Sequence, residues 1–127
     1  MYTFNKKERL NSKINIHRLF EHGSSFFSYP FKVYYNFEEI QEVSPRASVL
    51  FSIGKKQFKL AVDRNRIKRL CRESYRLNKS LLLDILEEKH IKAEVAFVYV
   101  GKTIPDFQDL EAKMQKALRQ LSLIKHK

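Results

Sequence analysis

The first helix of the chain is predicted from hydrophobic residues that recur at helical spacing in residues 13–21. Ser12 precedes this segment and suits the N-cap position. Gly23 follows it and is expected to end the helix in the left-handed conformation that glycine adopts easily. By composition, residues 1–11 form a loose, basic lead-in. The apolar face of the predicted helix consists of Ile16, Leu19 and Phe20.

Two later stretches alternate hydrophobic and polar residues with a period of two, as half-buried strands do. The first runs from Phe26 to Phe37 and the second from Ala47 to Ile53, with the acidic connecting loop EEIQEVSP (38–45) between them. The side chains expected to face the core are Phe31, Val33, Tyr35, Phe37, Ala47, Val49, Phe51 and Ile53. The opposite face of the first strand carries Lys32, Tyr34 and Asn36.

The second half of the chain predicts three helical segments and one buried strand. An amphipathic helix begins near Arg64 and breaks at Asn78, and KSLLLDILEEKH (79–90) holds a second, short helical segment. Residues 93–100 are almost wholly apolar, which is typical of a strand covered on both faces. Asp106 is the expected N-cap of the last helix. The apolar stripe of that helix comprises Phe107, Leu110, Met114, Ala117, Leu118 and Leu121.

These elements predict an α+β fold in a single domain, residues 1–127, with the order α-β-β-α-β-α. Helices packed on a mostly antiparallel central sheet would give a two-layer sandwich. A chain of 127 residues has room for one hydrophobic core, and its hydrophobic content of 43% is sufficient to fill it.

Several classes of protein fit this sequence poorly. The start of the chain lacks the apolar run of a signal peptide, and no window of about 18 apolar residues is present, so we expect a cytoplasmic protein without a membrane partner. The single cysteine, Cys71, lies on an apolar stripe and is expected to serve packing alone. The four scattered histidines do not have zinc-ligand spacing, and paired carboxylates are missing, so we expect no metal site and no catalytic residue in the protein itself.

Positive charge is concentrated in residues 55–77, which carry nine Lys or Arg residues against two acids. The difference, 9 − 2 = +7, is most of the formal net charge of +11. On the predicted helix, one stripe collects Ile67, Leu70, Cys71, Ser74 and Leu77, and the opposite side collects Arg64, Asn65, Lys68, Arg69, Arg72 and Arg76. Asp63 is expected to cap this helix, and Glu73 is expected to pair locally with Arg69 or Arg76.

The cationic side of this helix favours an anionic partner. Arg64, Lys68 and Arg72 follow one another at i, i+4 and i+8 without acids among them, so they repel one another unless a partner neutralises them. Guanidinium groups grip phosphate oxygens in pairs, which makes a polynucleotide backbone the natural counterpart. The alternative is a solvated surface held by salt bridges.

The run AVDRNRIKRLCRE (61–73) resembles the signature of the bacterial ribonuclease P protein subunit, in which Arg-Asn-Arg opens a basic helix. The N-terminal KKERLNSKINIHRLFEHG is similar to the family's first helix, which closes with Phe-x-x-Gly, and the strand PFKVYYN is also similar to the family. Two positions depart from the family pattern. The chain has one extra residue before the triplet, with Phe58 near the usual Gly, and Ile16 stands where a second Phe is common.

The resemblance implies a ribosomal-protein-like α/β sandwich with a left-handed strand–helix–strand crossover. It also implies a ribonucleoprotein enzyme in which Mg²⁺ bound by the catalytic RNA, and not by the protein alone, supports cleavage of precursor tRNA before its mature 5′ end. In such proteins a cleft beside the first helix holds the single-stranded 5′ leader, and the basic helix meets the catalytic RNA. Here that cleft would comprise Phe20, Lys32, Tyr34 and Asn36. The residues expected to contact RNA are Arg64, Asn65, Arg66, Lys68, Arg69 and Arg72, extended by Lys55, Lys56 and Lys59.

Two other classes of function share the basic helix. A structural RNA-binding protein of ribosomal type would have the same fold and no role in cleavage. A DNA-binding helix-turn-helix protein should show a second helix about four residues before the basic one, whereas strand-like sequence and a lysine-rich loop precede Arg64. We therefore expect RNA and not DNA as the partner.

Overall fold

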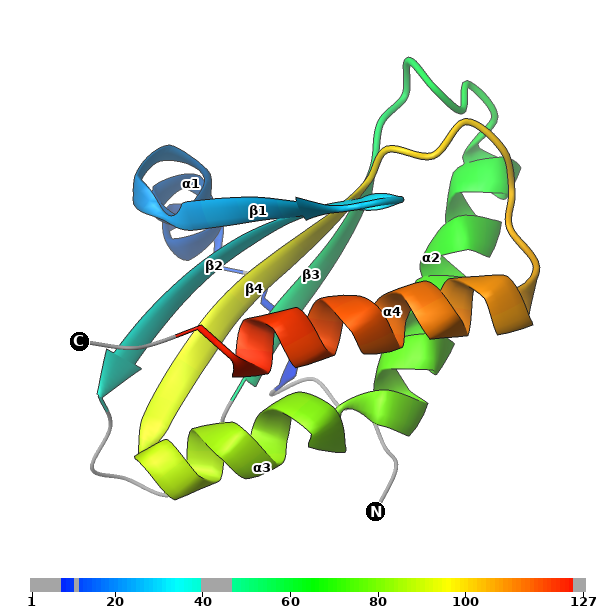
Figure 1. The fold of residues 1–127 in the computed structure, drawn as a ribbon. Coiled ribbons are helices and arrows are strands. Elements are labelled where there is room, and N and C mark those ends of the chain that lie inside the picture. The colour runs from blue at the N-terminus through cyan, green and yellow to red at the C-terminus, as the bar shows by residue number, and fades with distance from the viewer. Residues whose placement is uncertain (1–7, 11, 40–46, 125–127) are drawn as a thin grey trace.

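The computed structural model describes residues 8–10, 12–39 and 47–124 of the chain. This part of the chain forms four helices and one four-stranded sheet, which confirms the predicted α+β class (Figure 1). The helices are α1 (Lys13–His22), α2 (Ala61–Asn78), α3 (Ser80–Lys89) and α4 (Phe107–Ser122). The strands are β1 (Ser24–Ser28), β2 (Phe31–Glu39), β3 (Ala47–Ile53) and β4 (Ile91–Tyr99).

The strands lie in the order β1-β2-β4-β3. The pairs β1–β2 and β2–β4 are antiparallel, whereas β3 and β4 run parallel, so the sheet is mostly antiparallel as expected. Because adjacent parallel strands need a crossover connection, the chain passes through α2 and α3 between β3 and β4. The left-handed sense of this crossover stays a prediction.

The single strand predicted from Phe26 to Phe37 is wrong, because this stretch forms the two strands of a hairpin. The turn lies at Tyr29 and Pro30. Proline has no backbone N–H to donate to a neighbouring strand, so a strand seldom continues through it. The carbonyl of Pro30 instead accepts a hydrogen bond of 2.7 Å from the backbone N–H of Val100. The observed order is therefore α-β-β-β-α-α-β-α.

The main core lies between one face of the sheet and the three helices α2, α3 and α4 (Figure 1). All four inward positions predicted for β3 are buried, and in β2 Phe31 and Val33 are buried whereas Tyr35 and Phe37 are half-buried. The apolar stripe of α4 is buried as predicted except for Phe107, which is half-buried. Tyr75 of α2 also enters this core and was missed by the predicted stripe.

The opposite face of the sheet carries a second, smaller cluster beneath α1, so helices lie on both faces of the sheet (Figure 1). Leu10, Leu19 and Ala96 are buried there, and Ile16, Tyr34 and Leu50 pack around them. A simple two-layer sandwich is thus an incomplete description, because α1 forms a partial third layer. The periodicity of α1 indicates an apolar stripe but does not indicate which face of the sheet the stripe covers.

Two predicted helix ends are wrong in detail. Gly23 has φ −74° and ψ 162°, which is extended and not left-handed backbone. Helix α2 begins at Ala61 with Leu60 at the N-cap position and no side-chain cap. Asp63 therefore lies in the first turn of α2, where its carboxylate favours the positive end of the helix dipole.

Other helix ends are as predicted. The Ser12 hydroxyl accepts from the backbone N–H of Asn15, and the Asp106 carboxylate accepts from that of Asp109 at 2.8 Å. Helix α2 ends at Asn78, whose side-chain amide donates to the Ser74 carbonyl and to the Glu111 carboxylate of α4. Asn78 therefore ends one helix and ties it to another.

Residues 8–10 are not part of a loose lead-in. Arg9 forms a parallel bridge with Val49 at the outer edge of β3, and the N–H of Leu10 donates to the Val49 carbonyl at 2.9 Å. The Glu8 carboxylate bonds the Lys79 ammonium at 2.8 Å, between α2 and α3. The remainder of the predicted lead-in (1–7 and 11) and residues 40–45 of the predicted acidic loop lie outside the described residues, and Glu38 and Glu39 belong to β2.

Candidate RNA-binding surfaces

The sheet has an outer face, turned away from the main core, that carries the side chains predicted to bind an RNA leader. Residues paired across neighbouring strands point to the same face. Lys32, Tyr34 and Asn36 of β2 are paired with Phe27 and Ser25 of β1 and with Val98, Ala96 and Glu94 of β4. Helix α1 covers part of this outer face through the small cluster around Leu19.

Phe20 and Tyr34 meet at the border of α1 with the open part of the outer face. Their ring centroids are 4.7 Å apart in an edge-to-face arrangement. The Lys32 ammonium lies 5.1 Å from the centre of the Tyr34 ring, within range of a cation–π interaction. Phe20 keeps 37% of its surface exposed, and Tyr34 is half-buried. The structure thus brings together three of the four residues predicted for the cleft, with an aromatic surface next to a cation.

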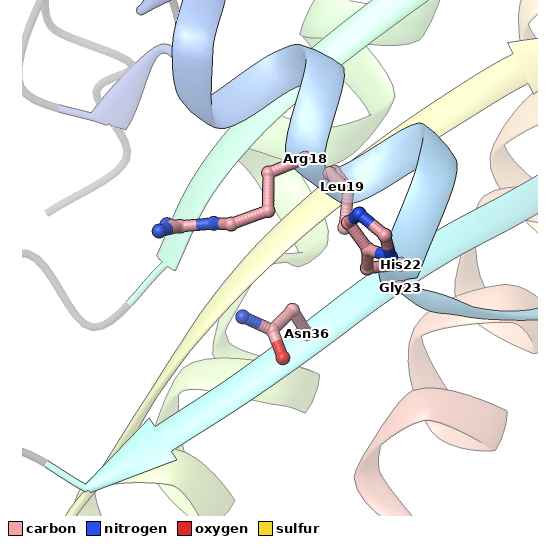
Figure 2. Close-up of a pocket in the computed structure, with 5 residues that line it drawn as sticks. All are labelled: Arg18, Leu19, His22, Gly23 and Asn36. Carbon is pink, nitrogen blue, oxygen red and sulfur yellow. The ribbon is translucent and has the colours of Figure 1, made fainter.

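The fourth predicted residue, Asn36, lines a pocket of about 120 Å³ between α1 and β2. Figure 2 shows the Asn36 side chain on β2 facing α1, from which Arg18 and His22 extend. The remaining lining residues are Leu19 and Gly23. Arg18 and His22 were not predicted as site residues, although their i, i+4 spacing on α1 places them on one side of the helix.

A buried carboxylate lies beside this pocket. Glu94 is the cross-strand partner of Asn36 and only 4% of its surface is exposed. The Arg18 guanidinium approaches the Glu94 carboxylate at 3.6 Å. Within the part of the chain that the structure describes, Glu94 Oε1 has no hydrogen-bond partner. Since an isolated buried charge is costly, the Arg18–Glu94 pair helps to hold α1 on the outer face.

The cationic side of α2 remains available to a partner. Ile67, Cys71, Ser74 and Tyr75 are buried on the inner side of the helix. Asn65, Arg66, Arg69 and Arg72 are exposed, and Arg64 and Lys68 are half-buried. Among the described residues, Arg64, Lys68 and Arg72 make no salt bridge with any acid. The prediction of a cationic face that lacks internal neutralisation is therefore confirmed within that part of the chain.

Arg64 has a second role that the sequence did not indicate. Its Nη1 donates to the carbonyls of Phe58 at 2.7 Å and Lys59 at 2.9 Å. These two bonds hold the loop before α2 against the first turn of the helix, where a side-chain cap is missing. A guanidinium has five N–H donors, so other donors of Arg64 stay available for phosphate oxygens.

Glu73 forms a salt bridge with Arg76, which is one of the two partners predicted for it. The hydrogen bond from Arg76 lowers the pKa of the Glu73 carboxyl below its usual value. Arg76, at the C-terminal end of α2, is therefore neutralised within the protein. The part of the surface that is not neutralised among the described residues comprises Arg64, Lys68 and Arg72. We call Lys55, Lys56, Lys59, Arg64, Asn65, Arg66, Lys68, Arg69 and Arg72 the basic surface.

The loop between β3 and α2 (residues 54–60) carries the lysines of the basic surface. Lys55, Lys56 and Lys59 are exposed, whereas Phe58 is buried and its ring lies 6.2 Å from that of Tyr99. The departure from the family pattern at Phe58 thus has a structural explanation, because this side chain anchors the longer loop to the core.

Cys71 is buried, as expected for a packing role, and burial raises the pKa of its thiol to about 12. Within the described residues, no group of three or more His, Cys, Asp and Glu side chains is placed to hold a metal ion. None of the helices in the described ranges is long and apolar enough to cross a membrane.

Comparison with known proteins identifies the family. A family model described as ribonuclease P matches residues 4–122. The ribonuclease P protein component of Porphyromonas gingivalis is 43% identical over 121 residues, which cover 95% of this chain and 88% of the relative. The chain belongs to the ribonuclease P protein family. The corresponding component of Chlorobaculum tepidum is 35% identical over 122 residues, covering 90% of this chain and 79% of that relative.

Solved structures of ribonuclease P proteins share the fold. The Thermotoga maritima protein superposes with a TM-score of 0.70 at 20% identity, covering 89% of this chain and 96% of that one. The Staphylococcus aureus protein gives 0.59 at 22% identity, covering 91% and 93%. At this level of identity the likeness supports the fold alone.

Family membership decides between the functions left open by the sequence. As a ribonuclease P protein, the chain is a subunit of the ribonuclease P holoenzyme, works with the ribonuclease P RNA, and serves in 5′ processing of tRNA. A structural RNA-binding protein of ribosomal type is not supported. A helix-turn-helix protein is also excluded, because β3 and the loop 54–60 precede α2.

Proposed function

We propose that the outer face holds the single-stranded 5′ leader of precursor tRNA and that the basic surface binds the ribonuclease P RNA. The observation that carries the first part is the partly exposed Phe20–Tyr34 pair with the Lys32 ammonium over the Tyr34 ring. An aromatic surface beside a cation suits unpaired nucleotides, because bases stack on the rings and phosphates approach the ammonium group. Asn36 in the adjacent pocket offers both a donor and an acceptor to a base edge.

The second part of the proposal rests on the charge of α2 and the loop before it. Exposed cations without acidic partners neutralise phosphates and thereby reduce the repulsion between two RNA molecules. The Mg²⁺ ions and the cleavage chemistry would belong to the RNA, as the family resemblance implies, and the reaction would take place in the cytoplasm. The protein contributes substrate affinity and charge neutralisation.

The leader site is tested by binding to the reconstituted holoenzyme. Phe20→Ala should weaken binding of precursor tRNA by about fivefold or more, the equivalent of a stacking interaction of ~1 kcal/mol, and should leave binding of leaderless tRNA unchanged. Ile14→Ala, another exposed apolar residue of α1, is the matched control and should change neither affinity. Equal losses for precursor and leaderless tRNA would refute the leader site.

The RNA-binding role of the basic surface is tested by the salt dependence of binding. Lys68→Ala should weaken the complex with ribonuclease P RNA and reduce the slope of log K against log salt by about 0.7–0.9. A slope equal to that of the wild type would show that Lys68 does not contact the RNA.

Adding the intact protein should also permit cleavage at lower Mg²⁺ than the RNA alone requires.

A further inference from the structure

Two large aromatic side chains near the β1–β2 turn have no role in either hydrophobic cluster. Phe27 is 61% exposed and Tyr29 is 57% exposed, and their ring centroids lie 6.2 Å apart. Single exposed hydrophobic residues are common, but two adjacent aromatic rings form a contiguous apolar patch of the kind that marks an interaction site.

This patch continues the outer face. Phe27 is paired directly with Lys32, so both side chains point to the same face as Tyr34. Tyr34 is the diagonal neighbour of Phe27 across the two strands, at about 7–8 Å, which aromatic side chains can span. The ring pairs Phe20–Tyr34 and Phe27–Tyr29 therefore lie along one face, from α1 to the turn of the hairpin, and we call these four residues the aromatic track. Lys32 lies midway along it.

The far end of the track adjoins the loop that carries the lysines. The Pro30 carbonyl accepts from the Val100 N–H at 2.7 Å, and the Val100 carbonyl accepts from the Gln57 side-chain amide at 3.1 Å. The hairpin turn and the loop 54–60 are thus tied to the same residue at one end of the sheet (Figure 1). Lys55, Lys56 and Lys59 are exposed in that loop. A single-stranded RNA that follows this path could stack its bases on the rings and bring its phosphates to the lysines at the end.

We propose that Phe27 and Tyr29 form a second stacking site for unpaired nucleotides of the 5′ leader, beyond the Phe20–Tyr34 site. This inference rests on the proposed function and deepens it, because it assigns to the protein a longer leader path that ends at the lysines of the basic surface. The site takes single-stranded RNA with little preference among bases, since every base offers a ring face. Precursors whose leader is too short to reach the hairpin turn gain nothing from it.

Leader length distinguishes the two stacking sites. Precursor tRNAs with a graded series of leader lengths are titrated against holoenzymes that contain wild-type protein, Phe27→Ser, Tyr29→Ser or Phe20→Ala. We expect Phe27→Ser and Tyr29→Ser each to weaken binding of long-leader precursors by about fivefold or more and to leave short-leader precursors unaffected. Phe27→Tyr and Tyr29→Phe retain a ring and should restore the affinity. Leu123→Ser removes a side chain that is 80% exposed at the C-cap of α4, and is the control for loss of surface hydrophobicity.

The outcomes separate this inference from the proposed function. If Phe27→Ser and Tyr29→Ser bind all leader lengths like the wild type while Phe20→Ala still discriminates against precursor, the second site is wrong and the first one stands. If no variant, Phe20→Ala included, responds to the presence of a leader, the proposed leader surface itself is wrong. If sedimentation shows a dimer that the serine variants dissociate without a change in leader affinity, the patch is a self-association surface, which also overturns the inference.

Discussion

Gly23 joins α1 to β1 at a point where a larger residue does not fit. A Cβ added to Gly23 would lie 2.5 Å from the Leu19 carbonyl oxygen and 3.1 Å from that of Tyr35. Both neighbours are backbone atoms, which cannot turn aside as a flexible side chain can. The glycine is therefore required because its backbone passes close to the last turn of α1 and to β2, and not because of a left-handed conformation.

We predict that Gly23→Ala lowers the free energy of unfolding by about 1–3 kcal/mol, the range for overpacking at a tight contact. Gly54→Ala is the matched control, because its added Cβ would meet only the Gln57 side chain at 3.7 Å. Gly54→Ala should leave stability unchanged or slightly increased. Denaturant unfolding of both variants tests the difference. Equal stabilities would show that the backbone around residue 23 can relax without a loss of stability.

Arg64 combines a structural contact with a surface charge. Arg64→Ala removes the hydrogen bonds to the Phe58 and Lys59 carbonyls, so the protein should lose about 1–2 kcal/mol of stability as well as affinity for ribonuclease P RNA. Arg66→Ala removes an exposed charge of the same kind, and should reduce the affinity and its salt slope while leaving thermal unfolding unchanged. If both variants unfold at the same temperature as the wild type, the contact of Arg64 with the loop does not stabilise the protein.

At the scale of elements, α1 is attached to the outer face by few contacts. Its buried side chain is Leu19, supported by half-buried Ile16 and by the Arg18–Glu94 pair. The other three helices share the much larger main core. Because the proposed leader site lies where α1 meets β2, the position of this weakly held helix sets the geometry of the site.

We predict that Leu19→Ala costs about 2–5 kcal/mol and that α1 loses protection first. Hydrogen exchange should become faster in the amides of α1 than in those of α2 and α4. Precursor binding should weaken, whereas the affinity for ribonuclease P RNA alone should change little. Ile14→Ala on the same helix is exposed and should alter neither measurement. Uniform acceleration of exchange across all helices would show instead that α1 unfolds together with the main core.

The sequence predicted most elements but not how they are arranged. Period-two and helical spacing located β3, α4 and α1, because these patterns reflect which side of an element is buried. The hairpin was missed because the same alternation continues on both sides of Pro30, although the proline itself is a signal that a strand seldom continues there. The exposure of Phe27 and Tyr29 could not be predicted from the sequence either, because a hydrophobic side chain in a strand is ordinarily assigned to the core.

Some features of the site could likewise be predicted from the sequence, and others could not. The cationic face of α2 follows from helical spacing, and the structure confirms that Arg64, Lys68 and Arg72 make no salt bridge among the described residues. The meeting of Phe20 with Tyr34 depended on which face of the sheet α1 covers. The family resemblance implied that pairing, whereas periodicity alone did not.

At the scale of the whole molecule, a thiol and two phenol groups buried in the core should make the free energy of unfolding fall at alkaline pH. Burial raises the pKa of Cys71 from 9.0 to about 12 and that of Tyr99 from 10.0 to about 12, and it also raises the pKa of Tyr75. Each group is neutral when protonated, and the folded protein favours that form. The contribution to stability is therefore fully present below about pH 9 and is lost as pH rises toward 12.

We predict that the free energy of unfolding falls above pH 9, with Cys71 contributing about 1.4 kcal/mol per pH unit. Cys71→Ala should be less stable than the wild type at neutral pH, because it leaves a small cavity, but its stability should decline less steeply between pH 9 and 11. Denaturant unfolding at a series of pH values measures both slopes. Parallel curves for the two proteins would show that the thiol does not titrate differently in the folded and unfolded states.

The position of β4 in the sheet has a consequence for synthesis of the protein on the ribosome. This strand lies between β2 and β3, although both of them precede it in the chain. Until residues 91–99 leave the exit tunnel, the nascent chain can form the β1–β2 hairpin but has nothing to join it to β3, and Phe31 and Phe51 lack their shared ring contact with Phe97 of β4. The emerging polypeptide therefore needs protection from aggregation until β4 has left the tunnel and can pair with both strands.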